Sequence, residues 1–121
     1  MIVLGGSSRQ SLAALRVALD NTLKGVSADD ASAISSGLFK ALVAIDSSTG
    51  LRRALTDSAR DASSKSDLVS DLFKKSLTGP VLALLANATS LRWSSPSGIA
   101  DAIEQIAVEA EATAANLGNS L

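Results

Sequence analysis

The sequence predicts an all-α protein, a six-helix bundle built as one domain. Apolar residues recur at spacings of three and four between short stretches rich in Ser, Thr, Asp and Gly, which is typical of amphipathic helices. No stretch alternates apolar and polar residues with the period of two that a half-buried strand shows, and no Asn-Gly hairpin signal occurs. A chain of 121 residues, 46% of them hydrophobic, is long enough for one core, so the helices are expected to pack on each other.

The first two predicted helices each carry one apolar stripe. The first covers about residues 8–23 and ends before Gly25, a residue that suits a helix C-terminus. The second starts at Ser27, has acidic residues in its first turn, and stops at the polar run 46–49. The stripes consist of Leu12, Leu15, Leu19 and Leu23, and of Ile34, Leu38, Leu42 and Ile45.

The middle of the chain predicts two shorter helices. The third lies within residues 50–60, and a polar connection at residues 61–67 follows it. Within that connection, Ser64 or Ser66 is expected to cap the fourth helix. In the third helix Leu51, Ala54 and Leu55 are expected to face inward, and the fourth helix carries the apolar residues Leu68, Val69, Leu72 and Phe73.

The last two helices share one start signal. Thr78 and Ser95 are the expected N-caps, and each precedes a proline in the first turn, where the missing N–H costs nothing. The fifth helix ends near Leu91. Gly118 ends the sixth, whose Ala-rich tail from Ala112 is expected to fray. The stripe of the sixth helix consists of Ile99, Ile103, Ile106 and Ala110.

The composition excludes several classes of protein. Without Cys the chain has no disulfide or thiol chemistry, and without His it lacks the usual general base and the commonest metal ligand. The 11 basic residues are scattered and the formal net charge is -1, so no nucleic-acid partner is expected. No apolar run approaches the roughly 18 residues of a membrane span, so no membrane insertion is expected. The sequence therefore predicts a protein that is not an enzyme and needs no cofactor and no metal.

Three short motifs have a chemical interpretation, but the structural interpretation of each is simpler. Residues 5–9 share only their glycines with a phosphate-binding loop, because no Lys-Ser pair and no preceding strand accompany them. Residues 87–89 fit the N-glycosylation pattern but lie inside a predicted helix. Asp101 and Glu104 share one helix face, which suits a solvated surface.

Two further features leave two interpretations open. Arg52 and Arg53 either mark a site for an anionic partner or lie on a solvated face. Trp93, near the end of the fifth helix, either anchors a partner or packs as a lid over the edge of the core.

The first and fifth helices carry more apolar surface than one stripe needs. A line of small uncharged residues runs beside the leucines of the first helix, and the fifth helix has two apolar arcs. Two neighbouring helices of this kind either bury the arcs in the core or leave a shallow groove that suits an amphipathic partner helix. The residues concerned are Ser11, Ala14 and Ala18 on the first helix, Val81, Leu84, Leu85 and Ala88 in one arc of the fifth, and Leu82, Ala86 and Thr89 in the other.

The C-terminal half resembles the delta subunit of bacterial ATP synthases, a family that includes the mitochondrial oligomycin-sensitivity-conferring protein. The resemblance lies in residues 51–73, LRRALTDSARDASSKSDLVSDLF, and in residues 78–110, TGPVLALLANATSLRWSSPSGIADAIEQIAVEA. RWSSP and ADAIEQIAVEA look especially like the actinobacterial branch. The order and length of the segments extend the resemblance from about Ser8 to Ala112, the N-terminal domain of the family.

The resemblance implies a six-helix bundle on top of the catalytic head, where a groove between the first and fifth helices takes the N-terminal helix of an alpha subunit. Two departures concern the groove. Ser11 stands where family members often carry an aromatic residue, and NATSLR replaces the NGR that follows the fifth helix of the family. By position, the groove would be lined by Ser11, Ala14, Leu15, Ala18, Val81, Leu84, Leu85 and Ala88.

The same resemblance implies the organisation and the role of the chain. Residues 1–7 would be a flexible lead-in or a junction segment, 8–112 the N-terminal helical domain, and 113–121 a helix end leading toward a missing C-terminal domain that grips the stalk b subunit. The domain would be a non-catalytic stator adaptor in the peripheral stalk, a monomer when isolated, at the cytoplasmic face of the bacterial plasma membrane. The alternatives are a stand-alone helical interaction module with a different partner, or a small hydrolase, for which no serine has a base.

Overall fold

The computed structural model describes residues 6–57 and 59–118, and the prediction of an all-α protein is confirmed for this part of the chain. Its six helices are α1 (Gly6–Leu23), α2 (Ala28–Asp46), α3 (Thr49–Thr56), α4 (Ala62–Phe73), α5 (Gly79–Ser90) and α6 (Pro96–Gly118). Of the expected lead-in, residues 1–5 lie outside the described residues, whereas residues 6 and 7 are the first of α1.

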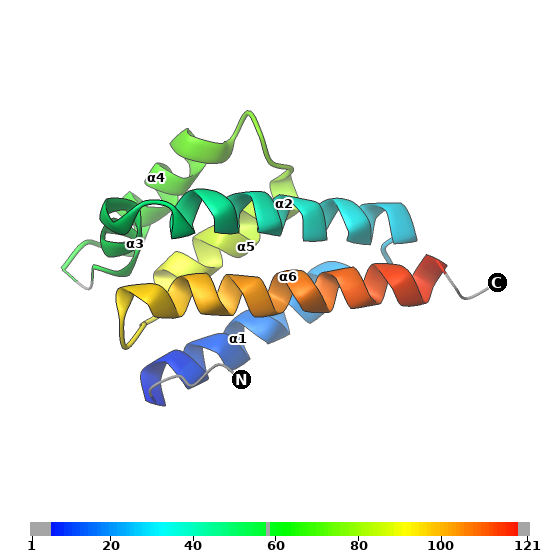
Figure 1. Ribbon diagram of the computed structural model, residues 1–121, viewed down its shortest axis with the longest axis horizontal. Helices are drawn as coiled ribbons and strands as arrows, with labels where there is room; N and C mark the ends of the chain where they lie inside the picture. The colour runs from blue at the N-terminus through cyan, green and yellow to red at the C-terminus, as the bar shows by residue number, and fades with distance from the viewer. Residues whose placement is uncertain (1–5, 58, 119–121) are drawn as a thin grey trace.

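Two long helices form the centre of the molecule. α2 and α6 lie side by side and run in opposite directions (Figure 1). α1 packs against α6 and α5, whereas α4 packs mainly against α5. The short α3 contacts both α2 and α6, so it covers one end of the central pair.

The core consists mainly of the stripes that the sequence predicts, although Leu42 is only half-buried, and Leu72 of α4 is 50% exposed, so it does not belong to the core. Leu12, Leu15 and Leu19 of α1 are buried, and Leu23 is half-buried. All four stripe residues of α6 are at most 1% exposed, because this helix is surrounded by α1, α2 and α3. The largest side chains with almost no exposure are Leu15, Leu19, Leu38, Ile45, Leu55, Leu85, Ile99, Ile103 and Ile106.

The helix starts confirm the predicted cap of α2 and correct that of α4. Ser27 caps α2, since its hydroxyl accepts a hydrogen bond from the Asp30 N–H at 3.1 Å. The prediction of Ser64 or Ser66 as the cap of α4 is wrong. The cap is Asp61, whose carboxylate accepts the N–H of Ser64 at 2.8 Å, so most of the expected polar connection is helix.

Both ends of the last two helices agree with the sequence signals. Thr78 occupies the N-cap position of α5, although its side chain makes no capping hydrogen bond, and Leu91 is the C-cap. α6 continues through the Ala-rich tail to Gly118. The division of the chain at residue 112 stays a prediction. Among the described residues, no helix is long and apolar enough to cross a membrane.

Two glycines occupy positions where a side chain would be unfavourable. Gly25 has a φ of +72° in the turn after α1, a conformation that favours glycine. Gly37 of α2 faces α5 so closely that an added Cβ would lie 2.8 Å from a methyl carbon of Val81.

Candidate functional site on helices α1 and α5

Small polar residues tie the start of α1 to the segment that follows α5. The Ser11 hydroxyl donates a hydrogen bond to the backbone carbonyl of Arg92. The Ser8 hydroxyl accepts the backbone N–H of Ser94 at 2.6 Å. Ser8 and Ser11 are both buried, so these bonds hold one end of the contact between α1 and α5 in place. In the sequence, Ser11 stands out only as a small uncharged residue, and nothing in the pattern around it indicates the hydrogen bond of its hydroxyl.

An ion pair between Arg16 and Glu109 holds one side of α1 against α6. Arg16 donates from Nε to both carboxylate oxygens of Glu109 of α6, at 3.0 Å each. This hydrogen bond and the negative charge of Glu109 raise the pKa of Arg16. Ala14 and Ala18 lie about 200° around the helix axis from Arg16, so they point away from this contact with α6.

The structure buries most of the residues predicted to line a partner groove. Ser11, Leu15, Val81, Leu84, Leu85 and Ala88 are at most 6% exposed, and Ala18 is half-buried. Ala14 alone of the eight is exposed. In this chain the six buried residues therefore belong to the packing between helices. Their assignment to a partner contact stays a prediction.

An uncharged strip of α1 lies at the edge of this buried seam. We call Ala14, Val17 and Ala18 the α1 strip; Val17 is 60% exposed and Ala14 is exposed. Asn21 continues the strip by one turn without adding a charge. On α5, the exposed residues Ala83 and Asn87 are also uncharged. An apolar helix face from another molecule would meet no charged side chain along this strip of α1.

Trp93 packs inward, as the lid interpretation holds. Its side chain is 9% exposed, and its indole N–H donates to the carbonyl of Ala88 at 2.8 Å. The ring of Trp93 and its indole N–H therefore both make their contacts within the chain.

The two neighbouring arginines have different roles. Arg52 donates to the carbonyls of Ile45 and Asp46 at the end of α2, and pairs with the Asp46 carboxylate at 3.7 Å. A cation at a helix C-terminus interacts favourably with the helix dipole, so Arg52 is a structural cap for α2. Arg53 is exposed. In the sequence, only the position of Arg52 six residues after the end of α2 could have indicated this role.

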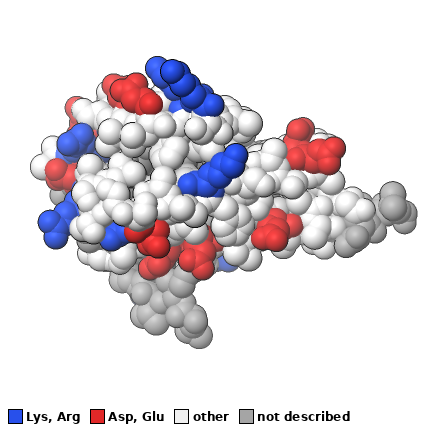
Figure 2. All heavy atoms as spheres, turned by 45° about the horizontal axis from the view of Figure 1, so that its top comes forward, with Lys and Arg blue, Asp and Glu red and all other residues white. Residues whose placement is uncertain are grey.

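The acidic side chains form no metal-binding cluster in the described part of the chain. No group of three or more acidic residues that could hold a metal ion occurs in residues 6–57 and 59–118. On the face shown in Figure 2, basic and acidic side chains are interspersed among wide uncharged areas. Burial, and then the nearby charge of Asp46, raise the pKa of Asp101, while Glu104 is exposed.

Comparison with known proteins finds relatives of this helical chain. No family model matches the chain. It is 33% identical to ATP synthase subunit delta of Streptomyces griseus over 118 residues, which cover 98% of the chain and 43% of that protein. It is 35% identical to the subunit of a Nocardioides species over 118 residues (98% and 42%), and 38% identical to that of an Arthrobacter species over 104 residues (86% and 36%).

The matches cover nearly the whole chain but less than half of each relative. The chain spans about two fifths of the length of these relatives and corresponds to their N-terminal part. The matched range of 118 residues includes nearly all of the chain. The chain is thus a homologue of the delta subunits of actinobacterial ATP synthases.

Proposed function

We propose that the chain is a non-catalytic stator adaptor in the peripheral stalk of a proton-translocating ATP synthase. It binds the N-terminal helix of an alpha subunit along α1 and α5 and so docks on the catalytic head. It acts at the cytoplasmic face of the bacterial plasma membrane, and the stalk b subunit binds a further part of the subunit that lies outside this sequence. Homology over 98% of the chain to ATP synthase delta subunits is the observation that carries the proposal.

The surface of α1 supports this mode of binding. Val17 is a large apolar side chain that remains 60% exposed, and the exposed Ala14 lies one turn before Ala18. An amphipathic helix that covers this strip would remove apolar surface from water, which is favourable in proportion to the area buried. The buried residues of the predicted set, Leu15 and Leu84 among them, would act as the rigid base below the contact.

The task of a stator adaptor is to resist torque, and a packed bundle suits it. A stalk subunit that holds two partners at once binds far more tightly than either contact alone, because the second contact becomes intramolecular. The helix contact proposed here can therefore be modest by itself. The hydrogen bonds of Ser8 and Ser11 to the segment after α5 hold α1 in place beneath the proposed contact.

The test uses the complete 121-residue chain and a synthetic peptide. The peptide carries about 20 residues from the N-terminus of the alpha subunit of an actinobacterial relative, a length of roughly 30 Å as a helix. We expect the amide resonances of α1 and α5 to shift when the labelled chain is titrated. Shifts that gather on the exposed face of α2 instead, or no shifts at all, would overturn the proposal and favour an interaction module with a different partner.

Ala14→Asp is expected to weaken peptide binding at least tenfold, about 1.4 kcal/mol, and to leave the fold intact. The reason is that a carboxylate placed under an apolar helix would lose water without gaining a partner, whereas in the free chain Ala14 is exposed. Calorimetric titration measures the affinity, and circular dichroism checks the fold. Ala33→Asp, at an exposed position of α2, is the matched control and should bind as the unmodified chain does.

A further inference from the structure

Lys65 of α4 is a buried cation that the proposed stator contact does not use. Its side chain is 6% exposed. Among residues 6–57 and 59–118, its ammonium has no hydrogen-bond acceptor and no carboxylate within ion-pair distance. Among the described residues, no fully buried side-chain nitrogen or oxygen lacks a hydrogen-bond partner, so the stem of Lys65 is buried while its ammonium still reaches solvent. An ammonium that reaches solvent with no carboxylate beside it is available to an anion.

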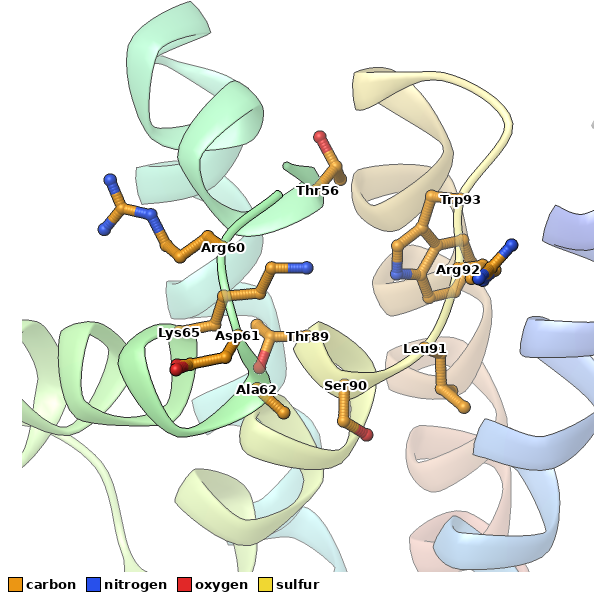
Figure 3. Close-up of a pocket in the computed structure, with 10 residues that line it drawn as sticks. All are labelled: Thr56, Arg60, Asp61, Ala62, Lys65, Thr89, Ser90, Leu91, Arg92 and Trp93. Carbon is orange, nitrogen blue, oxygen red and sulfur yellow. The ribbon is translucent and has the colours of Figure 1, made fainter. Parts of the chain in front are cut away.

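The ammonium of Lys65 points into a cavity of about 520 Å³. The cavity lies between the segment that joins α3 to α4 and the C-terminal end of α5, and Trp93 forms the wall opposite Lys65 (Figure 3). The space is on a different part of the molecule from the α1 strip, since none of its lining residues belongs to α1. Its volume is in the range of small-molecule sites.

The cavity is positively charged. Three cations line it, Arg60, Lys65 and Arg92, against one carboxylate, Asp61. Arg60 and Arg92 are exposed at the rim, and in Figure 3 their guanidinium groups point outward on either side. Both side chains are long and exposed, so each is free to change rotamer.

The uncharged side-chain donors around the cavity already donate hydrogen bonds within the chain. The hydroxyl of Thr56 donates to the carbonyl of Arg52, that of Thr89 to Ala86 and that of Ser90 to Asn87, at 2.8, 2.8 and 2.7 Å. The indole N–H of Trp93 is likewise bound. The side-chain donors that remain for a ligand are therefore those of the cations. Cations form shorter and stronger, charge-assisted hydrogen bonds with oxyanions.

We propose that this cavity binds a phosphate group, which contacts Lys65 inside the cavity and Arg60 and Arg92 at the rim. An excess of two positive charges matches the charge of nearly −2 that a phosphate carries at neutral pH, whereas a carboxylate would neutralise half of it. The cavity is larger than a phosphate ion, so it has room for an organic substituent on a phosphate ester.

Trp93 provides the measurement, because it is the only tryptophan and it lines the cavity. The chain is titrated with sodium phosphate, with glycerol 2-phosphate and with sodium acetate, each at constant ionic strength set by sodium chloride. We expect a saturable change in Trp93 fluorescence with the two phosphates and weaker binding of acetate. Tighter binding of the ester than of inorganic phosphate supports the site and assigns a phosphate ester as its ligand. A response that does not saturate, or that chloride reproduces, would overturn the site.

Lys65→Met is expected to weaken phosphate binding at least tenfold, about 1.4 kcal/mol, because it keeps the apolar stem and removes the charge. Lys65→Arg should restore much of the affinity. Lys74→Met, at the exposed end of α4, is the matched control and should leave binding unchanged.

A purely structural role of Lys65 predicts a different result. If Lys65 only supported the fold, Lys65→Met would unfold more easily without phosphate and bind it as before. We expect instead that the variant unfolds at about the same urea concentration in phosphate-free buffer, since methionine keeps the buried apolar stem of Lys65. Arg60→Gln, at an exposed position, tests the site without disturbing the interior and should also weaken binding. If neither variant changes the affinity, the proposal fails.

Discussion

Glycine residues set the closest contacts between helices of this protein. An added Cβ at Gly37 would lie 2.8 Å from one methyl carbon of Val81 and 3.3 Å from the other. Val81 is completely buried, and its short branched side chain has few alternative positions. α2 and α5 can therefore approach this closely only because residue 37 has no side chain.

Gly37→Ala tests this contact. Alanine gains about 1 kcal/mol in helix propensity, but overpacking a core costs about 1–3 kcal/mol, so we expect a net loss of roughly 1 kcal/mol in the free energy of unfolding. Urea denaturation measures the loss. Gly79→Ala, where an added Cβ meets nothing within 4 Å, should be neutral or stabilising.

A double variant separates the steric effect from other causes. Val81→Ala makes room for the added methyl group, so Gly37→Ala should become stabilising in that background. An unchanged penalty there would show that Val81 is not the cause.

The pH dependence of stability should include a contribution from Asp101. Burial raises the pKa of Asp101, and the charge of Asp46 raises it further. A carboxyl group with a higher pKa in the folded chain binds its proton more tightly when folded, so the free energy of unfolding falls as the pH rises through this range. Asp101→Asn should therefore be more stable than the unmodified chain at about pH 7, and the difference should vanish near pH 3.

Urea denaturation at a series of pH values measures this difference. The variant also serves as its own control at low pH, where both side chains are neutral. A variant that is less stable at neutral pH would show that the ionised Asp101 makes a favourable contact.

The helices begin where side chains satisfy their first N–H groups, and local sequence identifies only some of these residues. Ser27 is recognisable because acidic residues and then an apolar stripe follow it. At α4 the sequence offers Asp61, Ser64 and Ser66, all of which are suitable caps. Which of these three residues caps α4 depends on where the segment after α3 positions the first turn of the helix. The local sequence pattern does not determine that position.

Ser27→Ala should lower the free energy of unfolding by about 1 kcal/mol, the usual cost of losing an N-cap. The cause is the loss of the hydrogen bond from the Asp30 N–H. Thermal unfolding followed by circular dichroism measures it. Ser32→Ala, an exposed serine inside the same helix, should instead gain up to about 0.5 kcal/mol, because alanine is the better helix former.

The pattern on α5 shows why the fold was easier to predict than the site. Helical periodicity correctly indicated an apolar arc that contains Val81, Leu84 and Leu85, all now buried. Whether such an arc meets the same chain or a partner depends on how neighbouring helices are placed. The buried cation Lys65 was not predicted at all, because nothing in its polar sequence surroundings distinguishes it from a solvated lysine.

The whole molecule has one continuous core, which makes cooperative unfolding the expectation. Buried residues from all six helices belong to one cluster, and α3 and α4 have no separate core. Small domains of this kind unfold in one step.

Urea unfolding monitored by Trp93 fluorescence and by far-ultraviolet circular dichroism should give coincident transitions. Trp93 reports on the region near α4 and α5, whereas circular dichroism reports on all helices. An earlier transition in fluorescence would mean that the α3–α4 region opens separately from the central pair of helices.

The hydrogen bonds of Ser8 and Ser11 also have a consequence for biosynthesis. Their partners, Ser94 and Arg92, are 86 and 81 residues further along the chain. At about 5–20 residues per second, α1 is therefore synthesised roughly 4–17 s before the segment that holds it. For most of this interval α5 and α6, the helices on which α1 packs, have not been made, so Leu12, Leu15 and Leu19 stay uncovered. The nascent first helix is therefore a natural target for a chaperone that binds leucine-rich segments.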